Sequence, residues 1–193
     1  YGFDAGDSTF VGNGLAVGDL DADLRLELLT GARLADGPAN DQPSMGEARN
    51  WQTVASLPPT VDLRTQTRRV AYGVATGDYT ARGVRAGDVS GDGTDDWMVD
   101  ATLADGPGGS RIDAGAVFVF WGGTTLGTDL RASGGQQNVT IHGPNTSAES
   151  ILVSPIDLNA DGIKEVVLAT NISSSTTRPS VELVSPLDTD GDG

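Results

Sequence analysis

The chain has 193 residues, a formal net charge of −15 and no cysteine. Such a surplus of carboxylates opposes binding to nucleic acid and to anionic membranes, because proteins hold both largely through lysine and arginine. The lack of cysteine excludes disulfides and thiolate metal sites, and no apolar run approaches the roughly 18 residues of a membrane-spanning helix. We therefore expect no nucleic-acid partner and no insertion into a membrane.

The first motif in chain order is an acidic loop that begins at Asp19. Five of its positions can supply oxygen ligands: Asp19, Asp21, Asp23 and Glu27 through their side chains, and Arg25 through its backbone carbonyl. Calcium takes six to eight oxygen ligands, and alternate residues of a short loop can point to one ion. Position 6 of the loop is Leu24, which is poorly suited to a positive φ. We expect this loop to bind calcium less tightly than its two relatives.

The same loop returns at Asp88 and again at Asp157, so successive copies are 69 residues apart. The ligand positions are Asp88, Ser90, Asp92, Thr94 (carbonyl) and Asp96 in the second loop, and Asp157, Asn159, Asp161, Ile163 (carbonyl) and Glu165 in the third. Glycine holds position 6 in both, as Gly93 and Gly162. One copy alone could be an Asp/Gly-rich turn without an ion. Three copies at one spacing favour calcium sites.

EF-hands are the nearest competing calcium loop, but they need glutamate at position 12 and flanking helices. Position 12 is Thr30, Val99 or Leu168 here. The runs that follow the loops, Leu28-Leu29, 97–99 and 166–168, are apolar and too short for helices. They predict strands instead.

Further strands are expected at 114–121, which reads as buried, at 138–142, and at 181–184, which alternates and reads as half exposed. In the first unit, residues 51–57 occupy the position that corresponds to the strand expected at 114–121. We divide the chain into three repeats: 1–70 with an irregular insertion at 39–70, 71–137, and 138–193 ending in a partial fourth calcium loop.

The order of these features resembles the FG-GAP repeat of integrin α-subunit propellers and of bacterial surface proteins. The resemblance is carried by Tyr1-Gly2 and Tyr72-Gly73, by the acidic loops, and by Gly31-Ala32 after the first loop. It implies an all-β fold of tandem antiparallel blades, with a calcium loop joining two strands of each blade. His142 and Asp100 depart from the pattern, at the aromatic and Gly-Ala positions. Because a closed propeller typically has four to eight blades, we expect no closure within this chain.

The last residues begin a fourth acidic segment with Asp188, Asp190 and Asp192. Joined to Tyr1-Gly2 of another copy, this segment would resemble the Asp/Gly calcium segments of thrombospondin type 3 repeats. We therefore hypothesise three to four Ca²⁺ ions per chain and a head-to-tail array or filament of copies, at the cell surface or outside the cell. The alternative to such an array is that the sequence was cut at this point by chance, for example by proteolysis.

Two other classes of function stay open. Catalysis is not expected, because His142 is the sole histidine and no nucleophile motif is present. A carboxylate-dependent hydrolase that uses a pair from Asp62, Asp78, Asp113 and Asp129 is the weaker alternative. An adhesion or lectin-like module with a protein or glycan ligand is the other, and Trp51 and Trp121 could face that ligand.

Overall fold

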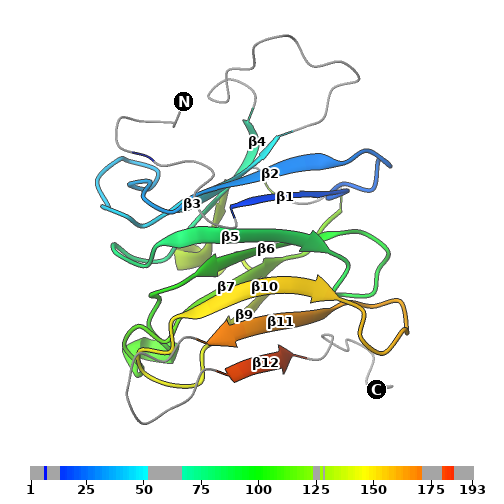
Figure 1. Cartoon of the computed structure of the whole chain (residues 1–193). Helices are drawn as coiled ribbons and strands as arrows, with labels where there is room; N and C mark the ends of the chain where they lie inside the picture. The colour runs from blue at the N-terminus through cyan, green and yellow to red at the C-terminus, as the bar shows by residue number, and fades with distance from the viewer. Residues whose placement is uncertain are drawn as a thin grey trace.

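A computed structural model describes residues 7, 14–51, 67–123, 127, 129–170 and 180–184 of the chain. Its regular structure is strand apart from two single-turn 3₁₀ helices, η1 (Pro107–Gly109) and η2 (Ala132–Gly134). Neither helix in this part of the chain has the length or apolar character to cross a membrane. The strands form three sheets, and none of them closes on itself within the described residues (Figure 1). The expected all-β fold of tandem, unclosed sheets is confirmed.

The first sheet has the order β1-β2-β3-β4-β8, with β1 (Leu15–Gly18), β2 (Glu27–Ala32), β3 (Glu47–Trp51), β4 (Thr67–Tyr72) and β8 (Asp129–Arg131). The second has the order β5-β6-β7-β9, with β5 (Thr80–Gly87), β6 (Asp96–Ala101), β7 (Ala116–Phe120) and β9 (Val139–His142). The third has the order β10-β11-β12, with β10 (Ser150–Ile156), β11 (Glu165–Thr170) and β12 (Ser180–Val184). All pairs are antiparallel except β4 with β8, which is parallel.

The 69-residue period of the sequence is also a period of the structure. The second strand of each sheet begins at Glu27, Asp96 or Glu165, which are 69 residues apart. In every sheet the acidic loop connects the first strand to the second, as the FG-GAP resemblance implies. The strands expected after the loops and near 114–121, 138–142 and 181–184 are all present.

One strand of the first sheet differs from the sequence-based expectation. β3 occupies Glu47–Trp51, 69 residues before β7, so it begins before the strand expected at 51–57, of which residues 52–57 lie outside the described residues. The segment 39–70, expected to be an irregular insertion, therefore contains β3 and most of β4. The sequence does not predict this strand, because its polar residues Arg49 and Asn50 hide the alternation that a half-buried strand normally shows.

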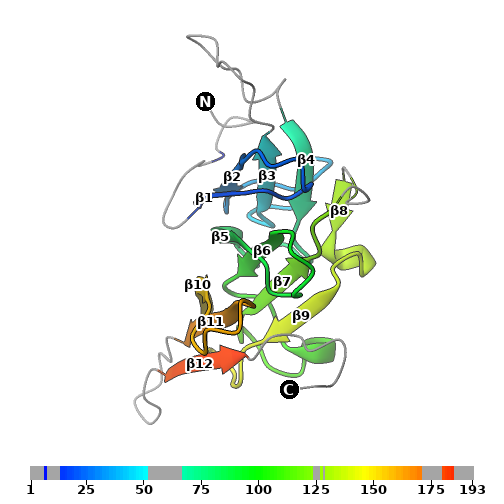
Figure 2. The same ribbon diagram turned by 90° about the vertical axis from the view of Figure 1, so that its right-hand side faces the viewer.

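The three sheets follow one another through the molecule, and the middle one is covered on both faces (Figures 1 and 2). Trp97, Val99 and Phe118 pack with residues of the first sheet such as Leu29, in one core. Met98, Val117 and Val119 alternate with them and pack with residues of the third sheet in a second core. Burying each of these large side chains contributes about 1.5–3 kcal/mol, so the two interfaces hold the sheets together.

Candidate metal centre

The three acidic loops share one backbone conformation and lie one below another at the same edge of the sheets (Figure 1). Positions 4 and 6 have a positive φ in every copy. The φ values are 58°, 79° and 64° at Ala22, Gly91 and Ala160, and 64°, 85° and 97° at Leu24, Gly93 and Gly162. The repeat in sequence is thus a repeat in loop geometry.

The carboxylate at position 1 accepts hydrogen bonds from backbone amides of its own loop. In the second loop Asp88 accepts hydrogen bonds from the amides of Gly91 (2.7 Å) and Gly93 (2.8 Å). The amides of the corresponding residues Leu24 and Gly162 donate to Asp19 (2.9 Å) and Asp157 (3.0 Å). Each carboxylate oxygen has a second lone pair, so these bonds leave the position-1 carboxylates able to bind a cation.

The carboxylate at position 5 stabilises the following turn of the loop through a hydrogen bond. Asp23, Asp92 and Asp161 each accept a hydrogen bond from the amide two residues later, at 2.8–2.9 Å. The donors are the residues that were expected to ligate through their carbonyls: Arg25, Thr94 and Ile163.

The carboxylate at position 9 is the first residue of the second strand and is buried in all three copies. Glu27 accepts a bond from the Leu20 amide (2.8 Å), and Glu165 accepts one from the Leu158 amide (2.8 Å). Asp96 has the shorter side chain and accepts three amides, those of Val89, Ser90 and Gly122. These bonds anchor the loop to its strand.

The first loop brings three carboxylates together. One oxygen each from Asp19, Asp21 and Glu27 lies within 4.8 Å of the others. Glu27 is fully buried, and its Oε1 atom has no hydrogen-bond partner. Burial raises the pKa of Glu27, and the negative charges of Asp21, Asp23 and Asp19 raise it further. A buried carboxylate needs a compensating charge, and these hard oxygen donors suit a divalent cation such as calcium or magnesium. This cluster could therefore hold a metal ion.

The second and third loops have a neutral residue at position 3. Ser90 Oγ is buried without a hydrogen-bond partner, so it is available as a ligand. Asn159 donates to Asp161 (2.7 Å) and accepts from the Asp161 amide (2.9 Å) on an exposed part of the third loop. These loops offer less charge to a cation than the first loop does.

Leu24 at position 6 was expected to weaken calcium binding by the first loop, yet this loop is the one that brings three carboxylates together. Leu24 adopts the positive φ that glycine adopts in the other copies, and its side chain is 93% exposed. The loop therefore reaches the common conformation at the cost of local strain, without a clash. Strain at Leu24 does not prevent the carboxylates of the first loop from converging.

Replacing Leu24 by glycine is expected to raise the free energy of unfolding by about 0.5–1 kcal/mol. A left-handed conformation costs a residue with a Cβ about 1–2 kcal/mol, and the greater freedom of glycine in the unfolded chain offsets part of that gain. Denaturant unfolding at fixed calcium measures the difference. Leu24→Ala is the matched control, because it removes the exposed side chain and keeps the strain. Equal stability of the two variants would contradict the strain at this position.

The loops of neighbouring sheets are hydrogen-bonded to one another. The amide of Asp95, at position 8 of the second loop, donates to the carbonyl of Asp19 (3.2 Å). The amide of Lys164, at position 8 of the third, donates to the carbonyl of Asp88 (2.9 Å). Asp95 Oδ2 also accepts from the Asp19 amide (3.1 Å), and Lys164 Nζ lies 3.7 Å from Asp95 Oδ1. Asp95 and Lys164 were not among the residues predicted from the sequence. The available signal for these contacts was a polar residue just before the position-9 carboxylate in two loops, 69 residues apart.

The remaining candidates from the sequence either lie outside the described residues or have contacts of other kinds. Asp188, Asp190, Asp192 and Asp62 lie outside the described residues. Asp129 forms an exposed ion pair with Arg131 (2.7 Å). Trp51 is buried and donates to Thr30 (2.9 Å), while Trp121 packs against the second core. Both tryptophans therefore have packing roles.

The chain was also compared with proteins of known families. No family model matches it, and no curated protein matches it in sequence.

Proposed function

We propose that this chain is a calcium-binding structural repeat module of an extracellular or cell-surface protein. In this proposal Ca²⁺ binds each acidic loop and makes the loop and its contact with the neighbouring sheet rigid. The observation that carries the proposal is the convergence of carboxylate oxygens from Asp19, Asp21 and Glu27, of which Glu27 is fully buried and has one oxygen without a hydrogen-bond partner. The FG-GAP resemblance supports it, since each sheet would then be one blade.

The donor set favours calcium over magnesium. Calcium accepts six to eight oxygen ligands in irregular arrangements, whereas magnesium demands an octahedron and usually keeps several waters. A loop of carboxylates, carbonyls and hydroxyl or amide oxygens fits the first requirement. Extracellular calcium modules bind at roughly 10⁻⁴–10⁻³ M, which suits permanent occupancy outside cells. Three ions would also reduce the formal net charge of −15, and with it the self-repulsion of the chain.

The link between successive units is a separate part of the proposal. It rests on the sequence of the Asp188–Asp192 segment and on the tandem arrangement of the sheets. In this view copies of the chain associate head to tail, and a fourth ion bridges them. Negative-stain microscopy of native material distinguishes such a filament from a monomer.

Calcium stoichiometry tests the proposed function. Equilibrium dialysis with radioactive calcium is expected to give three ions per chain, or four if the terminal segment binds one. Glu27→Gln keeps the acceptor for the Leu20 amide and removes the charge, so it is expected to lower the stoichiometry by one. Asp41→Asn, which changes an exposed carboxylate outside the loops, is the matched control and is expected to change nothing.

Two outcomes would reject the calcium proposal. One is the absence of saturable calcium uptake up to about 10 mM, well above the usual range of extracellular sites. The other is an equal loss of uptake in Glu27→Gln and Asp41→Asn, which would indicate diffuse attraction to a negative surface.

A further inference from the structure

The first acidic loop is held in place by the second sheet as well as by its own hydrogen bonds. The backbone amide of Asp95 donates to the Asp19 carbonyl (3.2 Å), and the Asp19 amide donates to Asp95 Oδ2 (3.1 Å). One residue of the second loop thus binds both backbone groups of Asp19. Because Asp19 is one of the three carboxylates that come together in the first loop, its position there depends on a residue outside that loop.

A further contact from the second sheet holds the next residue, Leu20. The amide of Gly123, which follows β7, donates to the Leu20 carbonyl (2.8 Å), and the Leu20 amide donates to Glu27 Oε2 (2.8 Å). The side chain of Leu20 is fully buried in the core that the first two sheets share. The second sheet therefore fixes the two residues through which the Asp19 and Glu27 carboxylates are positioned.

The carboxylate of Asp95 contacts both neighbouring loops. Its Oδ2 atom accepts the Asp19 amide of the first loop, and its Oδ1 atom lies 3.7 Å from Nζ of Lys164 in the third. The ion pair with Lys164 is partly exposed, and such pairs contribute little to stability. A hydrogen bond to an ionised acceptor is stronger than one between neutral groups. The contact with Asp19 is therefore the one expected to matter for the geometry of a loop.

The corresponding contact between the second and third loops is weaker. The Lys164 amide donates to the Asp88 carbonyl (2.9 Å), as Asp95 does to Asp19. A lysine side chain has only donors, however, so it cannot accept the Asp88 amide. Position 8 thus holds Asp19 through two hydrogen bonds and Asp88 through one. The second bond depends on the aspartate side chain at position 8, and not only on the stacking of the loops.

We propose that Asp95 is a positioning residue of the first calcium site. Its bond to the Asp19 amide keeps the Asp19 carboxylate where it meets those of Asp21 and Glu27. This inference rests on the proposed function, because it assigns a role in a site that we propose for Ca²⁺. Removing a residue that orients metal ligands typically lowers the metal affinity by about 10–100-fold. The first unit therefore reaches its full calcium affinity only when the second unit is folded against it.

The test measures calcium binding by the full chain, in competition with a chromophoric chelator at slightly alkaline pH. Asp95→Ala removes the acceptor, whereas Asp95→Asn removes the charge and keeps an oxygen for the Asp19 amide. We expect Asp95→Ala to weaken one calcium site about tenfold relative to Asp95→Asn, with the stoichiometry unchanged. Because both variants lack the negative charge and the ion pair with Lys164, their difference isolates the hydrogen bond.

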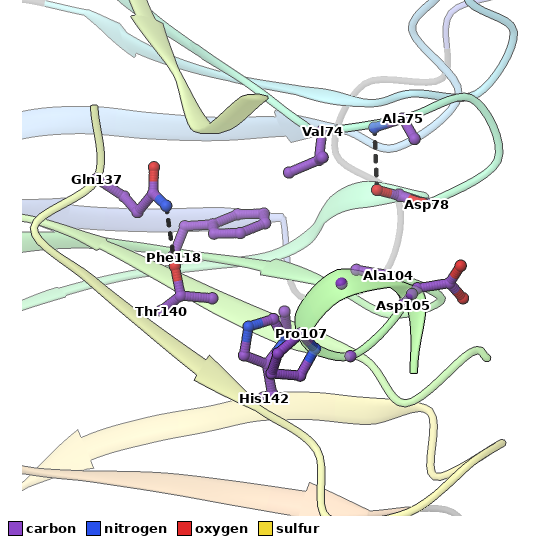
Figure 3. A pocket seen from close by; sticks show the side chains of 14 residues that line it. Val74, Ala75, Asp78, Ala104, Asp105, Pro107, Phe118, Gln137, Thr140 and His142 are labelled. Atoms are coloured by element: carbon purple, nitrogen blue, oxygen red, sulfur yellow. Dashed lines mark hydrogen bonds between the residues drawn. The ribbon is translucent and has the colours of Figure 1, made fainter. Parts of the chain in front are cut away.

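Asp78→Ala is the matched control. Asp78 also accepts a backbone amide, that of Ala75 (3.0 Å), but it precedes β5, whereas the second acidic loop follows that strand. It lines a cavity of about 430 Å³ beside β7 and β9 (Figure 3). Burial raises the pKa of Asp78 to about 6, so at slightly alkaline pH its replacement also removes one negative charge. This variant is expected to bind calcium as the natural chain does.

Two further variants identify the affected site and guard against misfolding. In the Glu27→Gln background, which is expected to lack the first site, Asp95→Ala should leave the remaining calcium affinities unchanged. Asp95→Leu is close to asparagine in shape and has no acceptor. It is expected to weaken the same site as Asp95→Ala, and it keeps the inference testable if the alanine variant does not fold.

Equal calcium affinities of Asp95→Ala and Asp95→Asn would overturn this inference and leave the calcium proposal in place. A tenfold loss that persists in the Glu27→Gln background would also overturn it, because Asp95 would then act on its own loop. If the natural chain takes up no calcium, or if Glu27→Gln does not lower the stoichiometry, the proposed function fails and this inference fails with it.

Discussion

Removal of calcium is expected to lower the midpoint of thermal unfolding by about 10 °C. An ion that binds only the folded chain adds about 1.4 kcal/mol when its free concentration is ten times the Kd, so three sites add about 4 kcal/mol. For a chain of this length each kcal/mol moves the midpoint by about 2–4 °C. The apo protein also has the full repulsion among its carboxylates, including the buried Glu27 and Asp96.

Scanning calorimetry in chelator and in calcium measures this shift. Because salt alone screens the charge of −15, sodium chloride at the same ionic strength and magnesium chloride are the controls. A shift of equal size in all three salts would indicate screening in place of specific binding. No shift in any of them would reject a stabilising role for the ions.

Asp100→Ala is expected to lower the free energy of unfolding by about 2–4 kcal/mol. The carboxylate of Asp100 is wholly buried; it accepts the Gly83 amide of β5 (2.6 Å) and faces the Leu152 amide of β10 (3.4 Å). It therefore joins its own sheet to the next one. Alanine would leave two buried amides without this acceptor, at about 1–3 kcal/mol each. Denaturant unfolding at fixed calcium provides the measurement.

The same residue predicts a pH dependence. Burial raises the pKa of Asp100 to about 7 from its ordinary value of 3.8, despite the hydrogen bonds from Gly83 and Leu152. The folded state thus holds a proton that the unfolded state releases. The stability that comes from this proton is complete below pH 3.8 and is lost as the pH rises through about 7.

Asp100→Asn removes the titration while keeping an acceptor for Gly83. Between about pH 5 and 8 the unfolding free energy of the natural chain is expected to fall relative to that of the variant. Comparing the two curves in saturating calcium cancels the contributions of the other carboxylates. Parallel curves would show that Asp100 does not titrate in this interval.

The sequence predicted those features that depend on local signals. Acidic loops followed by apolar runs located β2, β6 and β11, because both patterns are contiguous in the chain. It did not locate β3, where tertiary contacts bury polar residues. Leu24 adopts the positive φ considered for position 6, and its effect on calcium binding stays a prediction. Contiguous patterns in the sequence therefore locate the acidic loops and the strands after them, but not a strand whose buried residues are polar.

Other features could not be predicted because they join distant residues. The register of β5 against β6 shifts between Thr80 and Val84, and within this interval the Gly83 amide donates to the buried Asp100 carboxylate. Asp95 bonds Asp19 across 76 positions of sequence. Such contacts appear only when neighbouring sheets are assembled.

The bonds between successive loops also bear on how this chain can change in length during evolution. Position 8 of each later loop must meet position 1 of the loop before it, so an inserted residue inside a loop would separate two sheets as well as spoil one ligand set. The connection from β7 to β9 is constrained as well, because it contains β8, which pairs with β4 of the first sheet. We expect relatives of this chain to keep nine residues in every acidic loop.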